Sequence, residues 1–124
     1  MSNAKTPVKV LKVGLNRLHK GWTKMKWSNR NKQTGVTEVC IEGAIFGYKE
    51  DTKNPACLMA KDLVLQVIKE QYPHHKSIPS FNDAPETTMG DVEKVMKTAI
   101  IRAETGGLLK ETEEECYEPR KTWL

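Results

Sequence analysis

The sequence predicts a mainly α-helical protein, a four-helix domain built around a central buried helix, with a small β-hairpin or ordered loop after the first helix. Apolar residues recur at helical spacing in four segments, whereas strand-like alternation is confined to residues 23–39. The pairs Thr6-Pro7 and Asn54-Pro55 each combine a capping side chain with a proline at the first helical position, which marks a helix start. We therefore expect residues 7–107 to form a single helical domain.

The first helix is expected to begin at Pro7 and to end at Gly21. Its two faces differ, because apolar residues recur every three or four positions while lysines and an asparagine lie between them. The apolar face comprises Val8, Leu11, Leu15, Leu18 and Trp22.

A short hairpin or ordered loop should follow, because Met25 and Trp27 alternate with polar residues and the turn-forming stretch 28–35 separates them from Val36. A second, short helix is predicted from Thr37, which could cap it. Its apolar face would comprise Cys40, Ile41, Ala44, Ile45 and Tyr48. Gly43 is unfavourable within a helix, so its presence indicates the close approach of another backbone.

The third helix should run from Asn54-Pro55 to Tyr72, before Pro73. Its apolar residues occupy most of the circumference, which predicts the central helix, buried on more than one side. Residues 73–85 contain three prolines and no helical period, and we expect a connecting loop. A loop of this length is often functional or disordered.

The last helix is predicted to start near Thr87 or Thr88, where Thr88 and Asp91 form an approximate capping box, and to end at Gly106-Gly107. Its buried face would comprise Met89, Val92, Met96, Ala99 and Ala103. Residues 108–124 form an acidic C-terminal tail in this interpretation, either solvated or an anchor that packs on its own or a neighbouring chain.

The composition is that of a folded globular chain: of 124 residues, 38% are hydrophobic and 29% charged. No apolar run reaches the ~20 residues that a membrane-spanning helix needs. Residues 1–7 lack the apolar core of a secretory signal, and residues 2–4 could be the remnant of an expression tag. We expect a cytoplasmic protein.

The three cysteines are Cys40, Cys57 and Cys116, an odd number at wide separations, which favours reduced thiols over a disulfide framework. We expect Cys40 and Cys57 to be buried as small hydrophobic residues. Metal-ligand spacing is absent: the only close pair is His74-His75, whose side chains should diverge because they are adjacent. We therefore expect neither a metal site nor a cofactor.

Charge is distributed unevenly along the chain. The first 34 residues hold nine basic and no acidic side chains, whereas the whole chain has a net charge of +4. Within this basic lobe, cations alternate with an aromatic residue, a pattern that can stack bases in a positive groove. The residues concerned are Lys24, Lys26, Trp27, Arg30 and Lys32. The alternative is a solvated basic surface, with Trp27 covering the core.

Three short motifs stand out: Gly21-Trp22-Thr23, the segment Cys40-Ile41-Glu42-Gly43-Ala44, and the segment Phe81-Asn82-Asp83-Ala84-Pro85. With them, the chain from about Leu11 to Ala103 resembles a family of small uncharacterised proteins from actinobacteria and their phages, a domain of unknown function. Its members typically have a helix ending in Gly-Trp, a Cys-x-x-Gly-Ala helix and a Trp/Phe-Asn-Asp segment before the last helix. The resemblance implies a fold more than an activity, and the lysine-rich start and acidic tail depart from it.

Asn82 and Asp83 are the polar pair that the resemblance and the loop interpretation both single out. In a structural role, their side chains would bond to nearby backbone groups and hold the loop against the last helix. In a functional role, Asp83 would be a carboxylate beside a pocket closed by Trp22, by His74 or His75, and by Cys40.

Three functions therefore remain open, and the leading one is a small non-enzymatic binding or regulatory protein. By its resemblance it would be phage-encoded and would act on a host or phage protein through the tail or the basic lobe. The second is a nucleotide or nucleic-acid binder using the basic lobe, and the third is a hydrolase or transferase built on Asp83 with a histidine or Cys40. A homo-oligomer is compatible with all three. The candidate binding residues are Asn82, Asp83, Trp22, Lys24, Lys26, Trp27, Arg30 and Lys32.

Overall fold

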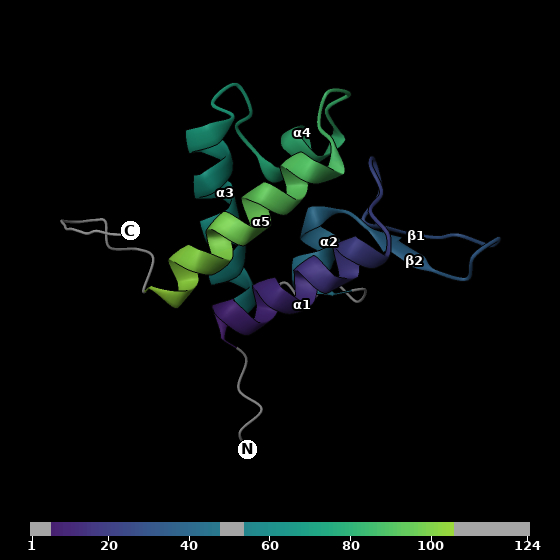
Figure 1. The fold of residues 1–124 in the computed structure, drawn as a ribbon, viewed down its shortest axis with the longest axis horizontal. Coiled ribbons are helices and arrows are strands. Elements are labelled where there is room, and N and C mark those ends of the chain that lie inside the picture. Colours follow the sequence, from purple (N-terminus) through teal and green to yellow (C-terminus); the bar gives the residue numbers. More distant parts are fainter. Residues whose placement is uncertain (1–5, 48–53, 106–124) are drawn as a thin grey trace, which may run out of the picture.

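The computed structural model describes residues 6–47 and 54–105, and in these ranges the fold is mainly helical with one small antiparallel hairpin, as predicted (Figure 1). The elements in chain order are α1 (Pro7–Lys20), β1 (Ser28–Arg30), β2 (Thr37–Val39), α2 (Ile41–Phe46), α3 (Pro55–Gln71), α4 (Ile78–Asp83) and α5 (Met89–Glu104). The described part of the chain thus has five helices, one more than expected. The predicted acidic tail, residues 108–124, lies outside the described residues, as does Cys116.

The first helix begins where its capping signal predicts. The Thr6 side chain accepts a hydrogen bond from the Lys9 backbone N–H at 3.2 Å, and Pro7 occupies the first turn. Leu11 and Leu18 on the apolar face are completely buried. The helix ends at Lys20, and the Gly21 N–H donates to the Arg17 carbonyl.

The second helix starts later than predicted, because residues 37–39 pair in the hairpin. Strand β2 lies antiparallel to β1, with Ser28 opposite Val39 and Arg30 opposite Thr37. Val39 is also fixed to the end of α1, since its N–H donates to the Gly21 carbonyl at 2.9 Å. Thr37 therefore cannot cap a helix.

Cys40 takes the capping position of α2 instead. Its Sγ accepts a hydrogen bond from the Gly43 N–H at 3.3 Å. The close approach expected at Gly43 is confirmed: a Cβ atom there would lie 2.4 Å from the carbonyl oxygen of Trp27. Cys40 is half-buried rather than buried, whereas Cys57 is buried as predicted.

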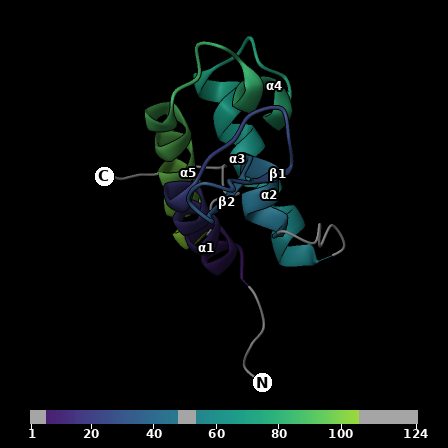
Figure 2. The same ribbon diagram turned by 90° about the vertical axis from the view of Figure 1, so that its right-hand side faces the viewer.

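Helix α3 packs against α1, α2, α4 and α5, which agrees with its predicted central position. Val64, Val67 and Ile68 are completely buried in the shared core. Leu58 and Met59 are 42% and 44% exposed, so the buried surface does not extend around the whole helix. In Figure 2, α1 and α5 lie on one side of the molecule and α2 and α3 on the other.

The segment 73–85, predicted to be a connecting loop, contains the short helix α4. Ser77 caps it by accepting from the Ser80 N–H at 3.2 Å. Of the three prolines, Pro79 stands in the first turn, where proline is tolerated, and the other two flank the helix. Six residues are too few to produce a helical period in the sequence. Phe81 is completely buried and ties α4 to the core.

Helix α5 confirms the predicted capping box. The Thr88 side chain accepts from the Asp91 N–H, and the Asp91 carboxylate accepts from the Thr88 N–H. The helix ends at Glu104, and the predicted Gly106-Gly107 end lies outside the described residues. None of the helices in the described ranges has the length and hydropathy needed to cross a membrane.

Candidate functional site

Asn82 is almost completely buried, and its side chain makes four hydrogen bonds. Its Oδ1 accepts from the Trp22 Nε1–H at 2.8 Å and from the Ile41 N–H at 3.0 Å. Its Nδ2 donates to the Thr23 carbonyl at 3.1 Å and to the Asp83 Oδ1 at 2.8 Å. These bonds use the amide fully, so Asn82 joins α4 to the segment after α1 and to the start of α2.

Asp83 is half-buried, and hydrogen bonds orient its carboxylate through one oxygen, Oδ1. Its Oδ1 also accepts a hydrogen bond from the Met25 N–H at 2.8 Å. Its Oδ2 bonds to no residue within ranges 6–47 and 54–105. The carboxylate therefore has a fixed direction and an acceptor oxygen available to a ligand.

Met25 has an unusual backbone conformation beside this carboxylate. Its φ of 69° lies in the left-handed region, which costs a residue with a Cβ atom roughly 1–2 kcal/mol. The residue is 76% exposed. Strained residues of this kind concentrate at binding sites, where the surrounding structure holds them in place. Here the bond from the Met25 N–H to Asp83 contributes to that restraint.

An open pocket of about 190 Å³ lies between α4, the start of α2 and the segment 25–27. Its polar lining consists of Lys26, Cys40, Glu42, Asn82 and Asp83, and its apolar lining of Met25, Trp27, Ile78 and Pro79. The pocket thus joins two of the sequence motifs, one around Cys40 and one around Asn82, which are about forty residues apart in the chain.

The pocket lining holds more acidic than basic side chains. Burial, together with the charges of Glu42 and Asp83, raises the pKa of the Cys40 thiol, and hydrogen bonds from the Gly43 and Glu42 backbones oppose this only in part. A neutral thiol and two carboxylates therefore face one lysine, Lys26, which is exposed. A raised pKa is the opposite of what an activated cysteine nucleophile needs.

Of the predicted basic binding residues, Lys24 has a structural role. Its Nζ donates to the Ala84 carbonyl at 2.6 Å and to the Thr87 carbonyl at 3.0 Å, and it lies 5.2 Å from the centre of the Trp22 ring. Lys24 thus fixes the turn that connects α4 to α5.

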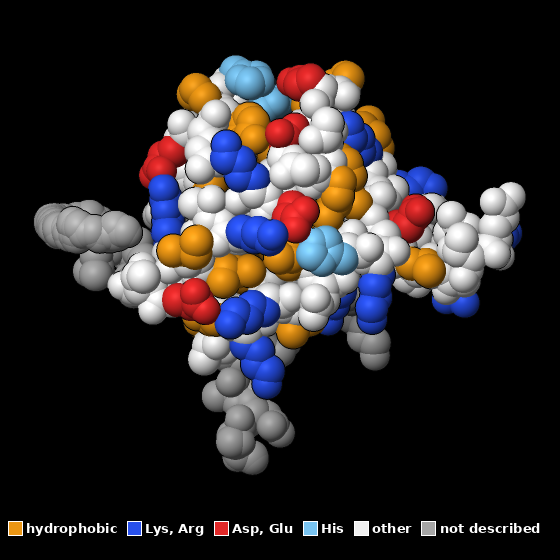
Figure 3. Space-filling model, viewed as in Figure 1, with side chains coloured by type: hydrophobic (Ala, Val, Ile, Leu, Met, Phe, Trp, Pro, Cys, Tyr) orange, Lys and Arg blue, Asp and Glu red, His pale blue; other side chains and the backbone are white. Residues whose placement is uncertain are grey.

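The side chain of Trp27 also makes contacts within the fold. Its Nε1 donates to the Gly47 carbonyl at 3.1 Å, and its ring stacks on Phe46 with a centroid distance of 6.0 Å. Arg30 and Lys32 are exposed on the hairpin and pair with no acidic side chain in the described ranges. On the face of the molecule drawn in Figure 3, basic side chains are scattered among acidic ones and are not gathered into one patch.

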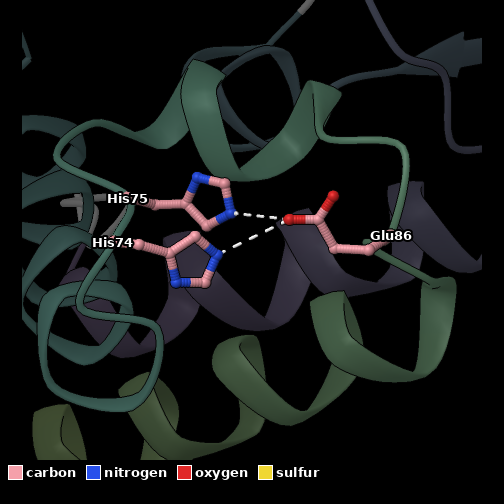
Figure 4. A group of neighbouring side chains, drawn as sticks. All are labelled: His74, His75 and Glu86. Atoms are coloured by element: carbon pink, nitrogen blue, oxygen red, sulfur yellow. Dashed lines mark ion pairs between the residues drawn. The ribbon is translucent and has the colours of Figure 1, made fainter.

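His74 and His75 do not line the pocket with Cys40 and Asp83. They lie together with Glu86 instead, and the expectation that their adjacent side chains diverge is wrong (Figure 4). The two residues lie in a tight turn, closed by the His75 N–H donating to the Tyr72 carbonyl at 2.9 Å, and not in an extended strand. Alternating directions are a property of extended strands.

The sequence alone did not single out Met25, Glu42 or Glu86 as site residues. Met25 has no distinguishing signal, because its importance lies in a backbone angle. Glu42 had one: it is the polar residue inside the Cys-x-x-Gly-Ala motif. Glu86 follows Pro85 in the same way that His74 follows Pro73, and this repeated pattern could have indicated two similar turns.

No curated protein and no solved structure is significantly similar to the chain. A family model described as "Family of unknown function (DUF6197)" matches residues 2–102. The match includes the hairpin, both Asn82 and Asp83, and nearly all of α5. Since it covers well over half of the 124 residues, the protein belongs to this family of unknown function.

Proposed function

We propose that this protein is a small non-enzymatic binding protein that receives a basic side chain of a protein partner in the pocket beside Asp83. The observation that carries the proposal is the Asp83 carboxylate, which two hydrogen bonds orient while its Oδ2 faces no partner in the described ranges. Because the orientation of such a carboxylate is already fixed, it loses little conformational entropy when it binds a guanidinium or ammonium group.

The rest of the pocket supports the same ligand. Glu42 adds a second negative charge and is held only loosely, with 3.8 Å between its Oε2 and the Lys61 Nζ. The exposed Met25 and Pro79 contribute apolar surface at the rim. An aliphatic stem with a charged end would contact both parts, as arginine and lysine side chains do.

A binding role fits the chemistry better than the hydrolase or transferase alternative. Such an enzyme would need a general base within hydrogen-bonding distance of Cys40 or beside Asp83. Neither histidine of the loop lines the pocket, and the Cys40 pKa is raised. We place the binding activity in the cytoplasm, with a host or phage protein as the partner that the motif resemblance suggests.

The test uses a charged probe and its neutral counterpart. N-acetyl-arginine amide should shift the backbone NMR signals of Met25, Cys40 and Asp83 in the ¹⁵N-labelled protein. N-acetyl-citrulline amide, which has nearly the same shape without the charge, should not. Shifts that spread over the surface, or that are equal for both compounds, would refute the proposal.

Asp83→Asn is the matching variant, because an asparagine oxygen can still accept from the Met25 N–H. It should weaken arginine-probe binding about tenfold or more, since a charged hydrogen bond contributes about 1.5–3 kcal/mol. Asp62→Asn on the exposed side of α3 is the control and should leave binding unchanged. Equal affinities of the two variants would show that Asp83 does not hold the probe.

One observation keeps nucleic-acid binding as a second candidate. Lys26, Arg30 and Lys32 are exposed near or on the hairpin, and none of them forms an ion pair with a carboxylate of the described residues. Because Lys24 and Trp27 are already engaged, only these three side chains of the predicted set remain for phosphate contacts. Binding through them would fall steeply with salt concentration.

A further inference from the structure

Two four-residue turns flank α4, and each has proline in its second position. In the turn from Tyr72 to His75, the third residue is His74, and the His75 N–H closes the turn on the Tyr72 carbonyl at 2.9 Å. In the turn from Ala84 to Thr87, the third residue is Glu86, and the closing distance is 3.1 Å. Proline fixes the backbone angle that this turn position requires. Proline therefore restricts the backbone of both turns.

The two turns bring His74, His75 and Glu86 together. Figure 4 shows both imidazole rings on one side and the Glu86 carboxylate opposite, with the Nε2 atoms directed at it. The His74 Nε2 lies 3.5 Å and the His75 Nε2 3.4 Å from the same oxygen, Oε2. One ligand atom from each residue fits within a span of 4.8 Å.

These distances are longer than charged hydrogen bonds and are compatible with two ligand atoms around one metal ion. Charged N–H to carboxylate bonds are shorter, about 2.7–2.9 Å. In a tetrahedral zinc site with Zn–N and Zn–O bonds of about 2.0–2.2 Å, two ligand atoms are about 3.3–3.5 Å apart. Both histidine-to-glutamate distances fall in that range.

The surroundings hold one ligand, His75, firmly in place. The His75 side chain is only 9% exposed, its Nδ1 lies 2.8 Å from the Ser80 Oγ, and its ring packs edge-on against Phe81. When Nδ1 donates to Ser80, the lone pair of the neutral ring is on Nε2 and points at the glutamate. Metal-binding histidines are oriented by this kind of outer hydrogen bond.

The second turn is held as well. Lys24 donates to the carbonyls of Ala84 and Thr87, the first and last residues of the turn that carries Glu86. The carboxylate itself is exposed, as is the His74 ring, so an ion can reach both from solvent.

We propose that His74, His75 and Glu86 bind a divalent transition-metal ion of the zinc class through both Nε2 atoms and the Glu86 carboxylate. Two imidazoles and one carboxylate are a recognised zinc ligand set, and the fourth position is left for water or for a side chain of a partner. The ion would join the turns at the two ends of α4. This site is separate from the Asp83 pocket and does not depend on the function proposed for it.

The test is zinc titration of the full chain by calorimetry, repeated with Co²⁺ for spectroscopy. We expect one ion per chain and a tetrahedral Co²⁺ spectrum without the intense near-ultraviolet band of thiolate ligands. Long-range ¹H–¹⁵N spectra of the imidazoles should show Nε2 as the ligand atom of both histidines. A thiolate band, coordination through Nδ1, or no saturable binding would overturn the proposal.

Variants separate this site from other zinc-binding groups. His74→Gln and Glu86→Gln change exposed side chains, so they should fold normally and lose at least tenfold in zinc affinity. His19→Gln is the control, because His19 also faces a glutamate, Glu93 at 3.4 Å, but without a second histidine. Ser80→Ala tests the outer hydrogen bond and should cost about 10–100-fold. Equal affinities of the His74, Glu86 and His19 variants would show that the ion binds elsewhere.

Discussion

Replacing Asn82 by alanine tests the central claim of the site, that one buried amide joins three segments. The change removes the partners of the Trp22 Nε1–H, the Ile41 N–H and the Thr23 carbonyl, as well as the bond to Asp83. A lost hydrogen bond costs about 0.5–1.5 kcal/mol, and a buried group left unpaired costs about 1–3 kcal/mol. We expect the free energy of unfolding to fall by about 3–5 kcal/mol, because three polar groups lose their partner and water replaces it only in part.

Urea denaturation, followed by circular dichroism and by tryptophan fluorescence, measures this change. Asn16→Ala is the control: Asn16 is exposed in α1, so the substitution carries the same change in helix propensity without the hydrogen bonds. We expect that variant to be as stable as the parent or slightly more so. If Asn82→Ala lost less than about 1 kcal/mol relative to this control, the four bonds would not be what joins the segments.

Three further predictions concern the neighbouring residues. Gly43→Ala should lower the free energy of unfolding by about 1–3 kcal/mol in the same denaturation assay, because the new Cβ atom would overlap the Trp27 carbonyl; an unchanged midpoint would contradict the close approach. Cys40 should react with iodoacetamide more slowly at pH 8 than a free cysteine, since its raised pKa keeps the thiol protonated. Peptide mapping measures the rate of alkylation at Cys40, and a rate equal to that of free cysteine would contradict the prediction. Joint replacement of Lys26, Arg30 and Lys32 by glutamine should leave the melting temperature nearly unchanged, because the side chains are exposed; Lys24→Gln should lower it, because both carbonyls lose their donor.

The sequence predicted the long elements well, since each carried its own signal. Helices α1, α3 and α5 start at capping residues followed by proline or by a capping box, and their buried faces repeat at helical spacing. The two six-residue helices were harder to predict. Helix α2 was expected three to four residues too early because Thr37 resembles a cap, and α4 was expected to be a loop because of its prolines. In both cases tertiary contacts determine the secondary structure, and a local sequence pattern does not contain that information.

The candidate site was predicted in part. Asn82 and Asp83 were identified as a pair with either a structural or a functional role, and the structure divides these roles between them: Asn82 is fully bonded, whereas Asp83 retains an oxygen without a partner in the described ranges. The grouping of His74 with Glu86 depends on two turns that meet in space. Spacing along the chain, with eleven residues between them, does not imply that contact.

The basic start of the chain has a structural reason that the charge count alone does not reveal. A helix of six residues is unstable by itself, and the carbonyls of its last turn have no partners within it. Arg17 from α1 donates to the Ala44 carbonyl in α2 at 2.9 Å, and Lys24 donates to the Ala84 carbonyl directly after α4. A cation at the C-terminal end of a helix also complements the helix dipole. Part of the positive charge of the first 34 residues thus stabilises the two short helices that form the pocket.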